Sequence, residues 1–159
     1  MEVLEVKTLY FEVQGKPMGL QRSRQDATGR RFDSKDNQEN KGRIAHKAKL
    51  KALQSGQTLP LPAGQTGYNI TITAYVTMPQ SCTRTQRDLI LRGILRPMGT
   101  PDIDNIAKLY LDALVQGGVI EDDRKVTELH VSREYLHSNG FDPFTAISVK
   151  WFEEEKDDE

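Results

Sequence analysis

The residues best suited to chemistry lie at positions 101–108, Pro-Asp-Ile-Asp-Asn-Ile-Ala-Lys, and in a second acidic run at positions 121–123, Glu-Asp-Asp. The first run brings two carboxylates, Asp102 and Asp104, close to a carboxamide and to the amine of Lys108. Oxygen-rich clusters of this kind are what a hard divalent cation such as Mg²⁺ prefers. Such an ion activates water and neutralises developing charge in phosphoryl transfer. The two runs therefore suggest a metal-dependent site that cuts phosphodiesters.

The spacing of Asp102 and Asp104 bears on where a helix can begin. Inside a helix the two side chains would point about 200° apart and could not share a ligand. In an extended stretch, residues two apart point the same way. Pro101 favours an extended conformation before it, and Asp is a preferred N-cap. We therefore expect both aspartates side by side ahead of a helix that starts at Asn105, with Lys108 one turn inside.

A simpler interpretation uses the same residues without a metal. One Asp before a helix is usually a cap that interacts with the helix dipole. Asp104 and Lys108 would then form an i,i+4 pair worth a few tenths of a kcal/mol. Capping explains one carboxylate, but it explains neither the second one nor Asp122 and Asp123 further along the chain.

The elements that must position these residues follow from the hydrophobic pattern. Strands are predicted at residues 3–13, 68–78, 126–136 and 144–152, and helices from about residue 34, over 83–94 and over 105–116. A turn at 138–140 is expected to join the last two strands as a hairpin. Apolar residues on both faces of the first strand predict that it is covered on two sides.

These elements predict a single α+β domain over residues 1–152, with a mixed β-sheet of about four strands and helices packed against it. Residues 153–159 form an acidic tail that we expect to be disordered. The third helix spans about 18 Å, so the two acidic runs meet only if the chain doubles back after it. Gly117-Gly118 permits that return.

Charge is unevenly distributed along the chain. Residues 1–100 hold 16 Lys and Arg against 8 Asp and Glu, a net of +8, and residues 101–159 hold 6 against 15, a net of −9. Two interpretations of the basic segment at 16–51 stay open: an arm for the DNA backbone, or a solvated helix with a flexible approach. The concentration of arginines in its loop favours DNA. The thin apolar stripe around Ile44 suggests that its helix packs weakly, or partly against another subunit.

Composition excludes several classes of protein. No apolar run approaches the roughly 20 residues of a membrane span, and no signal-peptide pattern opens the chain. The single cysteine, Cys82, cannot form an internal disulfide, so we expect a reducing, cytoplasmic setting in a bacterial or phage-infected cell. The three histidines are scattered and offer no ligand set.

The run at 101–108, followed by Leu-Asp-Ala-Leu at 111–114 and Asp-Asp-Arg-Lys-Val at 122–126, resembles the RusA family of Holliday-junction resolvases. The resemblance implies a homodimer that nicks two opposed strands of a four-way DNA junction, in recombination and repair. It also implies dependence on Mg²⁺, with Mn²⁺ as a substitute ion. By position, Asp102, Asp104 and Asp123 match the catalytic, metal-binding carboxylates and Lys108 the catalytic lysine. The choice of Asp123 over Asp122 rests on the resemblance alone.

The candidate DNA-binding residues are basic and lie upstream of the acidic motif. They are Lys16, Arg22, Arg24, Arg30, Arg31 and Arg96. Family members commonly carry a basic residue directly before the first aspartate, where this chain has Thr100-Pro101, and Arg96 is the candidate substitute. Arg84, Arg87 and Arg92 fit a phosphate contact and ordinary surface charge equally well. The alternative functions are a non-catalytic DNA-binding module of the same fold and a nuclease for flaps or forks.

Overall fold

The most regular apolar-polar alternation in the sequence forms the centre of the sheet. A computed structural model describes residues 3–21, 24–32, 34–138 and 140–155. In β4 (Tyr68–Val76), Tyr68, Ile70, Ile72 and Ala74 are all fully buried, and the residues between them are partly exposed. Such alternation is expected of a strand with only one face on the core.

Three further strands complete a four-stranded sheet in the order β1-β6-β4-β5. They are β1 (Leu4–Gln14), β5 (Val126–Tyr135) and β6 (Phe144–Glu154). β6 is antiparallel to both of its neighbours, whereas β4 and β5 are parallel. The predicted mixed sheet is therefore confirmed.

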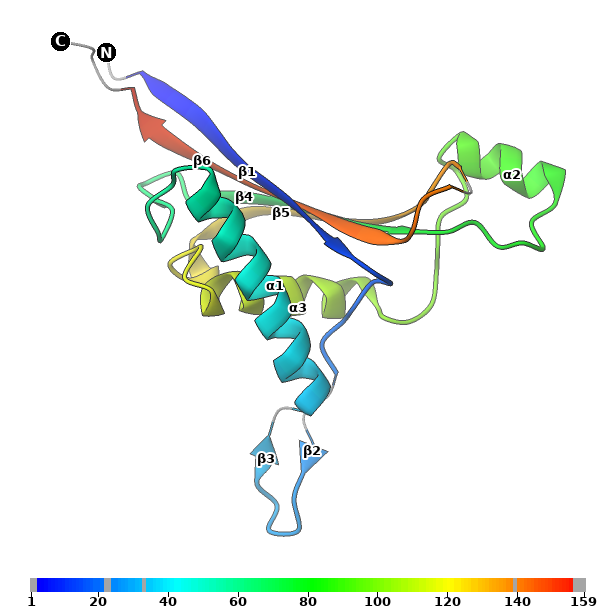
Figure 1. The fold of residues 1–159 in the computed structure, drawn as a ribbon, viewed down its shortest axis with the longest axis horizontal. Coiled ribbons are helices and arrows are strands. Elements are labelled where there is room, and N and C mark those ends of the chain that lie inside the picture. The colour runs from blue at the N-terminus through cyan, green and yellow to red at the C-terminus, as the bar shows by residue number, and fades with distance from the viewer. Residues whose placement is uncertain (1–2, 22–23, 33, 139, 156–159) are drawn as a thin grey trace.

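Two long helices cover one face of this sheet, α1 (Lys35–Gln54) and α3 (Ile103–Gln116), as Figure 1 shows. The short α2 (Arg84–Leu91) lies apart from them, and a small hairpin of β2 (Arg24–Gln25) and β3 (Arg31–Phe32) projects from the start of α1. A 3₁₀ turn, η1 (Asp123–Lys125), leads into β5. The described residues thus form the expected single α+β domain, with three α-helices.

The apolar stripe of α1 belongs to the core of its own chain. Ile44, Ala45, Ala48 and Ala52 are all buried, and α1 contacts both α3 and β1. The approach to the end of α3 is close, because a side-chain carbon at Gly117 would lie only 2.9 Å from the Ala45 carbonyl oxygen. The expectation that this stripe packs weakly or against another subunit is therefore wrong.

The expectation that the first strand is covered on both faces is also wrong. Leu9, Phe11 and Val13 of β1 are buried, but Val6 and Tyr10 on its other face are 54% and 47% exposed. Both long helices lie on the same side of the sheet, so the opposite face has no covering layer in the described chain (Figure 1). Apolar residues on both faces of a strand did not require two layers here.

The last two strands do not form the predicted hairpin. β4 lies between β5 and β6 and pairs with both of them. The physical reason is burial: β4 and β6 both bury apolar residues on the helix-covered face, and the two central positions give each of their backbones two hydrogen-bonded neighbours. Asn139 of the predicted turn lies outside the described residues.

The end of the domain also differs from the prediction. β6 continues through Glu153 and Glu154, which the sequence places in the acidic tail, and the amide of Glu155 donates to the carbonyl of Val3 at 2.9 Å. Trp151, the single tryptophan, is fully buried within this strand. Pairing with β1 holds these acidic residues in the sheet. Residues 156–159 of the predicted tail lie outside the described chain.

Candidate active site

The start of α3 holds the first acidic run. The helix begins at Ile103, with Asp102 as an extended N-cap residue at φ −66° and ψ 157°. Asp104 lies in the first helical turn, so the prediction that both aspartates precede the helix holds for Asp102 and is wrong for Asp104. An acidic residue in the first turn is favoured by the helix dipole, which lets the helix start two residues before Asn105.

The carboxylate of Asp102 is not used as a helix cap. Its side chain makes no capping hydrogen bond, although its backbone carbonyl accepts from the amide of Ile106 at 3.0 Å. The structure therefore shows no capping role for this side chain, and its carboxylate is exposed to solvent.

Lys108 lies one turn beyond Asp104 on the same helix. Its Nζ is 4.0 Å from Asp104 Oδ2, and the two side chains are 62% and 65% exposed. A pair this open contributes little to stability. Asp102, Asp104 and Lys108 thus present two carboxylates and an ammonium group at one exposed end of α3.

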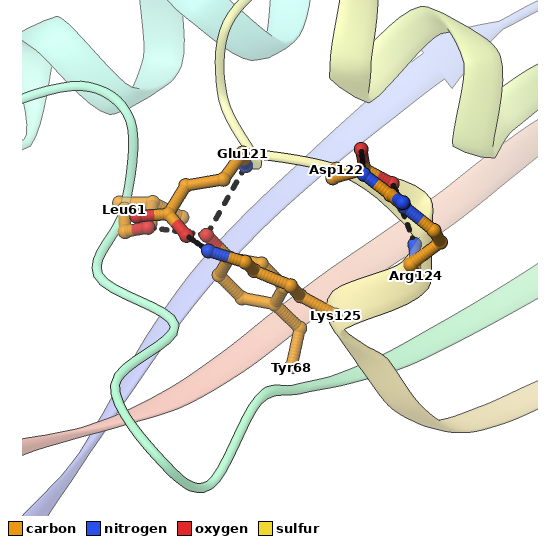
Figure 2. Close-up of polar contacts among 6 residues, drawn as sticks. All are labelled: Leu61, Tyr68, Glu121, Asp122, Arg124 and Lys125. Atoms are coloured by element: carbon orange, nitrogen blue, oxygen red, sulfur yellow. Dashed lines mark hydrogen bonds and ion pairs between the residues drawn. The ribbon is translucent and has the colours of Figure 1, made fainter.

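The second acidic run is fixed to the core through Tyr68, at the start of β4 (Figure 2). The buried Tyr68 hydroxyl donates to the Leu61 carbonyl and accepts from the amide of Glu121 at 3.2 Å. Burial raises the pKa of this hydroxyl further above its ordinary value, so it is protonated and able to donate at neutral pH. The Glu121 carboxylate pairs in turn with Lys125, so both ends of the acidic turn are held.

Within that turn, the carboxylate of Asp122 is occupied by Arg124. It accepts from the Arg124 backbone amide at 2.9 Å, from Nε at 3.2 Å and from Nη2 at 3.0 Å (Figure 2). The hydrogen bonds from the Arg124 side chain hold the pKa of Asp122 well below its usual range. Asp123, the first residue of η1, is exposed. These contacts favour Asp123 over Asp122 as a ligand to an added group.

The two acidic runs lie at opposite ends of one unit formed by α3 and β5. The 14 residues of α3 span about 21 Å. Asp123 follows the C-terminal end of that helix, and β5 then returns, reaching Arg133 beside Pro101 after about 23 Å of extended chain. Val119 and Ile120 are buried, and both amides donate to the Leu114 carbonyl, which keeps this part of the return at the far end of α3.

The prediction that one chain brings these carboxylates together is therefore wrong. Within the residues that the structure describes, no three His, Cys, Asp or Glu side chains are grouped closely enough to hold a metal ion. Gly117-Gly118 does turn the chain, but too few residues follow before Asp123 for it to reach the start of α3. The roles of Asp102, Asp104 and Asp123 stay predictions.

The predicted DNA-binding residues gather mainly on the β2–β3 hairpin. Arg30 and Arg31 are exposed there, and the backbone of Arg24 lies in β2; Lys16 is exposed after β1. Arg22 lies outside the described residues. Arg96 instead pairs with Glu134 at 3.7 Å, so its guanidinium already has an anionic partner.

The turn of this hairpin is organised by Asp26. Its carboxylate accepts from the Thr28 amide at 2.9 Å, the Thr28 hydroxyl at 2.6 Å and the Arg30 amide at 3.0 Å. The hydrogen bond from the Thr28 side chain and that from the Arg30 backbone lower the pKa of Asp26. This contribution to the turn is present above the ordinary Asp pKa and is lost as pH falls through the lowered one.

The base of the hairpin is fixed by residues that sequence patterns do not single out. The buried Asn37 accepts from the Gln21 amide at 2.9 Å and donates to the Gln21 carbonyl at 2.9 Å. Next to it, the amide of Leu20 donates to the carbonyl of Asn105 at 2.9 Å. The chain ahead of the hairpin is thereby attached to the first turn of α3 through Leu20 and to α1 through Gln21.

A second functional candidate that the sequence does not reveal is Arg133 of β5. Its Nη1 donates to the carbonyls of Gly99 and Pro101, directly before Asp102. A basic residue in an alternating strand is indistinguishable, in sequence, from ordinary surface charge.

The fold and these residues describe a class of protein: a small α+β domain with exposed arginines on a hairpin and exposed acidic residues at the start of α3. The family model described as Endodeoxyribonuclease RusA matches residues 14–149, and the chain belongs to this family. The RusA family comprises Holliday-junction resolvases, so the predicted family, fold class and nuclease activity are confirmed. Comparison with curated proteins gives no match. No helix in the described chain is long and apolar enough to cross a membrane.

Proposed function

We propose that this chain acts as a homodimeric, Mg²⁺-dependent endonuclease that resolves four-way DNA junctions by paired nicks, in recombination and repair within the bacterial cytoplasm. RusA nucleases are generally metal-dependent and take DNA junctions as substrate. The observation that carries the proposal is the exposed group of Asp102, Asp104 and Lys108 at the start of α3, next to the tethered basic hairpin.

The donor set fits Mg²⁺, with Mn²⁺ as a substitute. Asp102 offers a carboxylate with no capping duty, Asp104 offers a second in the first turn, and Asp123 a third in η1. Hard divalent cations prefer such oxygens and retain several waters, which suits an exposed site. When bound, the ion supplies activation of water and neutralisation of charge on the phosphate.

The residues of the chain divide the remaining work. Asp102, Asp104 and Asp123 hold the cation, and Lys108 donates to the phosphate oxygens, on which negative charge develops as the phosphodiester is attacked. A lysine one helical turn from the carboxylates acts as a point charge that rotates to meet the phosphate. Lys16, Arg24, Arg30 and Arg31 bind the DNA backbone; Arg22 and Arg96 are further candidates for the same surface.

Completion of the site requires a second copy of the chain. The start of α3 and η1 are about 20 Å apart in one protomer, whereas ligands of one cation lie within a few ångströms of each other. A two-fold axis is able to set the start of one α3 beside η1 of the other, and it generates two such sites. In such a dimer, Asp102 and Asp104 of one protomer and Asp123 of the partner subunit would hold the cation, and the two sites would serve two opposed strands.

The test of the proposal is cleavage by the Asp104→Asn protein. Loss of a carboxylate ligand should reduce cleavage of a four-way junction in Mg²⁺ by more than about 100-fold, since even supporting residues commonly cost 10–100-fold. Junction binding without metal should be retained. The matched control is Asp36→Asn, another exposed acid in the first turn of a helix. Full activity of Asp104→Asn would sink the assignment.

Substrate choice is tested by a panel of four-way junctions, flaps, forks and linear duplex at equal concentration. Paired nicking of the four-way junction in preference to the others is the expected outcome. Preferential cleavage of flaps or forks would redirect the proposal to another branched substrate, with the same chemistry.

A further inference from the structure

The segment that leads into α3 is held by hydrogen bonds from one side chain of the sheet, Arg133. Arg133 lies in β5 opposite Ala74, whose side chain is buried on the helix-covered face. From there its Nη1 donates to the Gly99 carbonyl at 2.7 Å and to the Pro101 carbonyl at 3.0 Å. The second of these carbonyls belongs to the residue directly before Asp102.

These hydrogen bonds are important because the segment has no regular secondary structure to fix its backbone. Residues 94–101 contain neither helix nor strand. On another side, Gly19 packs against Pro101 so closely that an added side-chain carbon would lie 2.4 Å from Pro101 Cβ. Pro101 is therefore held between the chain that follows β1 and the end of β5. Fixing Pro101 also fixes the backbone of Asp102, the next residue in the chain.

We propose that Arg133 is a positioning residue that holds the segment ahead of α3 so that the carboxylates of Asp102 and Asp104 are set for metal binding. The inference rests on the proposed function, because it concerns the same carboxylates. Arg133 acts through the Gly99 and Pro101 carbonyls and does not itself bind the cation.

The chemistry of the contact makes arginine suitable. A guanidinium nitrogen carries two hydrogens in one plane, so Nη1 bonds both carbonyls at once, and the charge strengthens both bonds. Metal affinity is sensitive to such supports, because ligands must be held within about 0.5 Å of their working geometry. Lysine keeps the charge but is one bond shorter, so it should recover only part of the effect.

The experiment measures Mn²⁺ binding to the full-length protein without DNA, by electron paramagnetic resonance. Arg133→Met should raise the dissociation constant for Mn²⁺ about 10–100-fold, and Arg133→Lys should fall between it and the unaltered protein. Arg92→Met is the matched control, since Arg92 forms an exposed pair with Asp88 on α2, and it should leave the affinity unchanged. Unaltered Mn²⁺ affinity in Arg133→Met would overturn the inference.

Folding is monitored through the buried Trp151, whose fluorescence reports on the sheet. If Arg133→Met fails to fold, Arg133→Lys decides: weakened Mn²⁺ binding supports the inference, and unaltered binding overturns it. A DNA contact is separated by junction binding in EDTA, which a positioning role leaves unchanged. Weaker junction binding with a reduced salt dependence would mean that Arg133 binds phosphate, and the inference would fail.

Mn²⁺ binding to the unaltered protein distinguishes failure of the proposed metal site from failure of the proposed role of Arg133. If it binds Mn²⁺ and Asp104→Asn abolishes that binding, the proposed site stands whatever the Arg133 variants do. If the unaltered protein binds no Mn²⁺, the proposed metal site fails and the role of Arg133 fails with it.

Discussion

At the scale of single residues, the two aspartates of the first run are not equivalent. Asp102 is an extended N-cap residue with an unused carboxylate, and Asp104 sits in the helix with Lys108 4.0 Å away. Asp104 therefore has a cationic neighbour in the protein without substrate, and Asp102 has the more independent carboxylate. Binding of a phosphate would draw Lys108 away from Asp104 and leave both carboxylates to the cation.

Lys108→Ala is expected to separate charge stabilisation from binding. Loss of a positioned donor to a developing negative charge costs about 10²–10³-fold in kcat. The exposed pair with Asp104 adds little to stability, so the fold should be unaffected. Single-turnover cleavage of a four-way junction measures the loss, and junction affinity in EDTA serves as the control. A variant with the cleavage rate of the unaltered protein would contradict the role of Lys108.

How far sequence predicts residues depends on whether their chemistry repeats in a pattern. Spacing singles out Asp102, Asp104 and Lys108 as candidates, because two acids, an amide and a lysine near a helix start are an unusual combination, and their catalytic roles stay predictions that the family resemblance implies. The start of the helix was misjudged by two residues, since Asp104 is compatible with either side of that boundary. Arg133 was missed because its partners are backbone carbonyls, which leave no trace in side-chain types.

At the scale of elements, the β2–β3 hairpin is a tethered arm. The Asp26 turn closes its tip, and the Gln21–Asn37 pair closes its base. The sequence predicts either an arm for the DNA backbone or a flexible approach to a helix here, because arginines and polar residues dominate the segment. It could not reveal the closure, which depends on one buried amide, Asn37, on the neighbouring helix.

The double variant Arg30→Ala, Arg31→Ala is expected to weaken junction binding in a salt-dependent way. Each lost phosphate contact reduces the slope of log affinity against log salt by about 0.9 on duplex DNA, so the double variant should lower it by up to about twice that. Fluorescence anisotropy across a salt series in EDTA measures the slope. Lys49→Ala, Lys51→Ala, at the far end of α1, is the control. An unchanged slope would remove these arginines from the DNA-binding surface.

At the scale of the whole molecule, sequence predicted the class of fold but not the order of the strands. Alternation predicts the strand at residues 68–78 and composition predicts the one at 126–136, but neither pattern says which strand lies beside which. The central position of β4 becomes evident only in the structure, where its apolar face is buried in the core. That order also separates the candidate residues, because β5 runs back along α3 from η1, which holds Asp123, to Arg133 beside Pro101.

Mixed dimers test whether two chains build each site. Asp104→Asn and Asp123→Asn homodimers should both be inactive, whereas a dimer of one chain of each kind should contain one intact site. That dimer should nick one strand of a four-way junction without completing resolution. Differently tagged, co-expressed chains allow its purification, and denaturing gels detect the nick. If the mixed dimer nicks neither strand although both homodimers are folded, a site shared between chains would be contradicted.

The separation of the two acidic runs along α3 and β5 has a consequence for how the cleavage activity depends on the concentration of the protein. If the proposed shared site is right, a lone chain would carry both acidic runs but could not bring them to one phosphate. Below the dissociation constant of the dimer, cleavage would then fall with the square of the protein concentration, by mass action. At low concentration the nuclease would be inactive on ordinary DNA. A four-way junction that binds two chains would bring them together as a dimer and make them active at that junction.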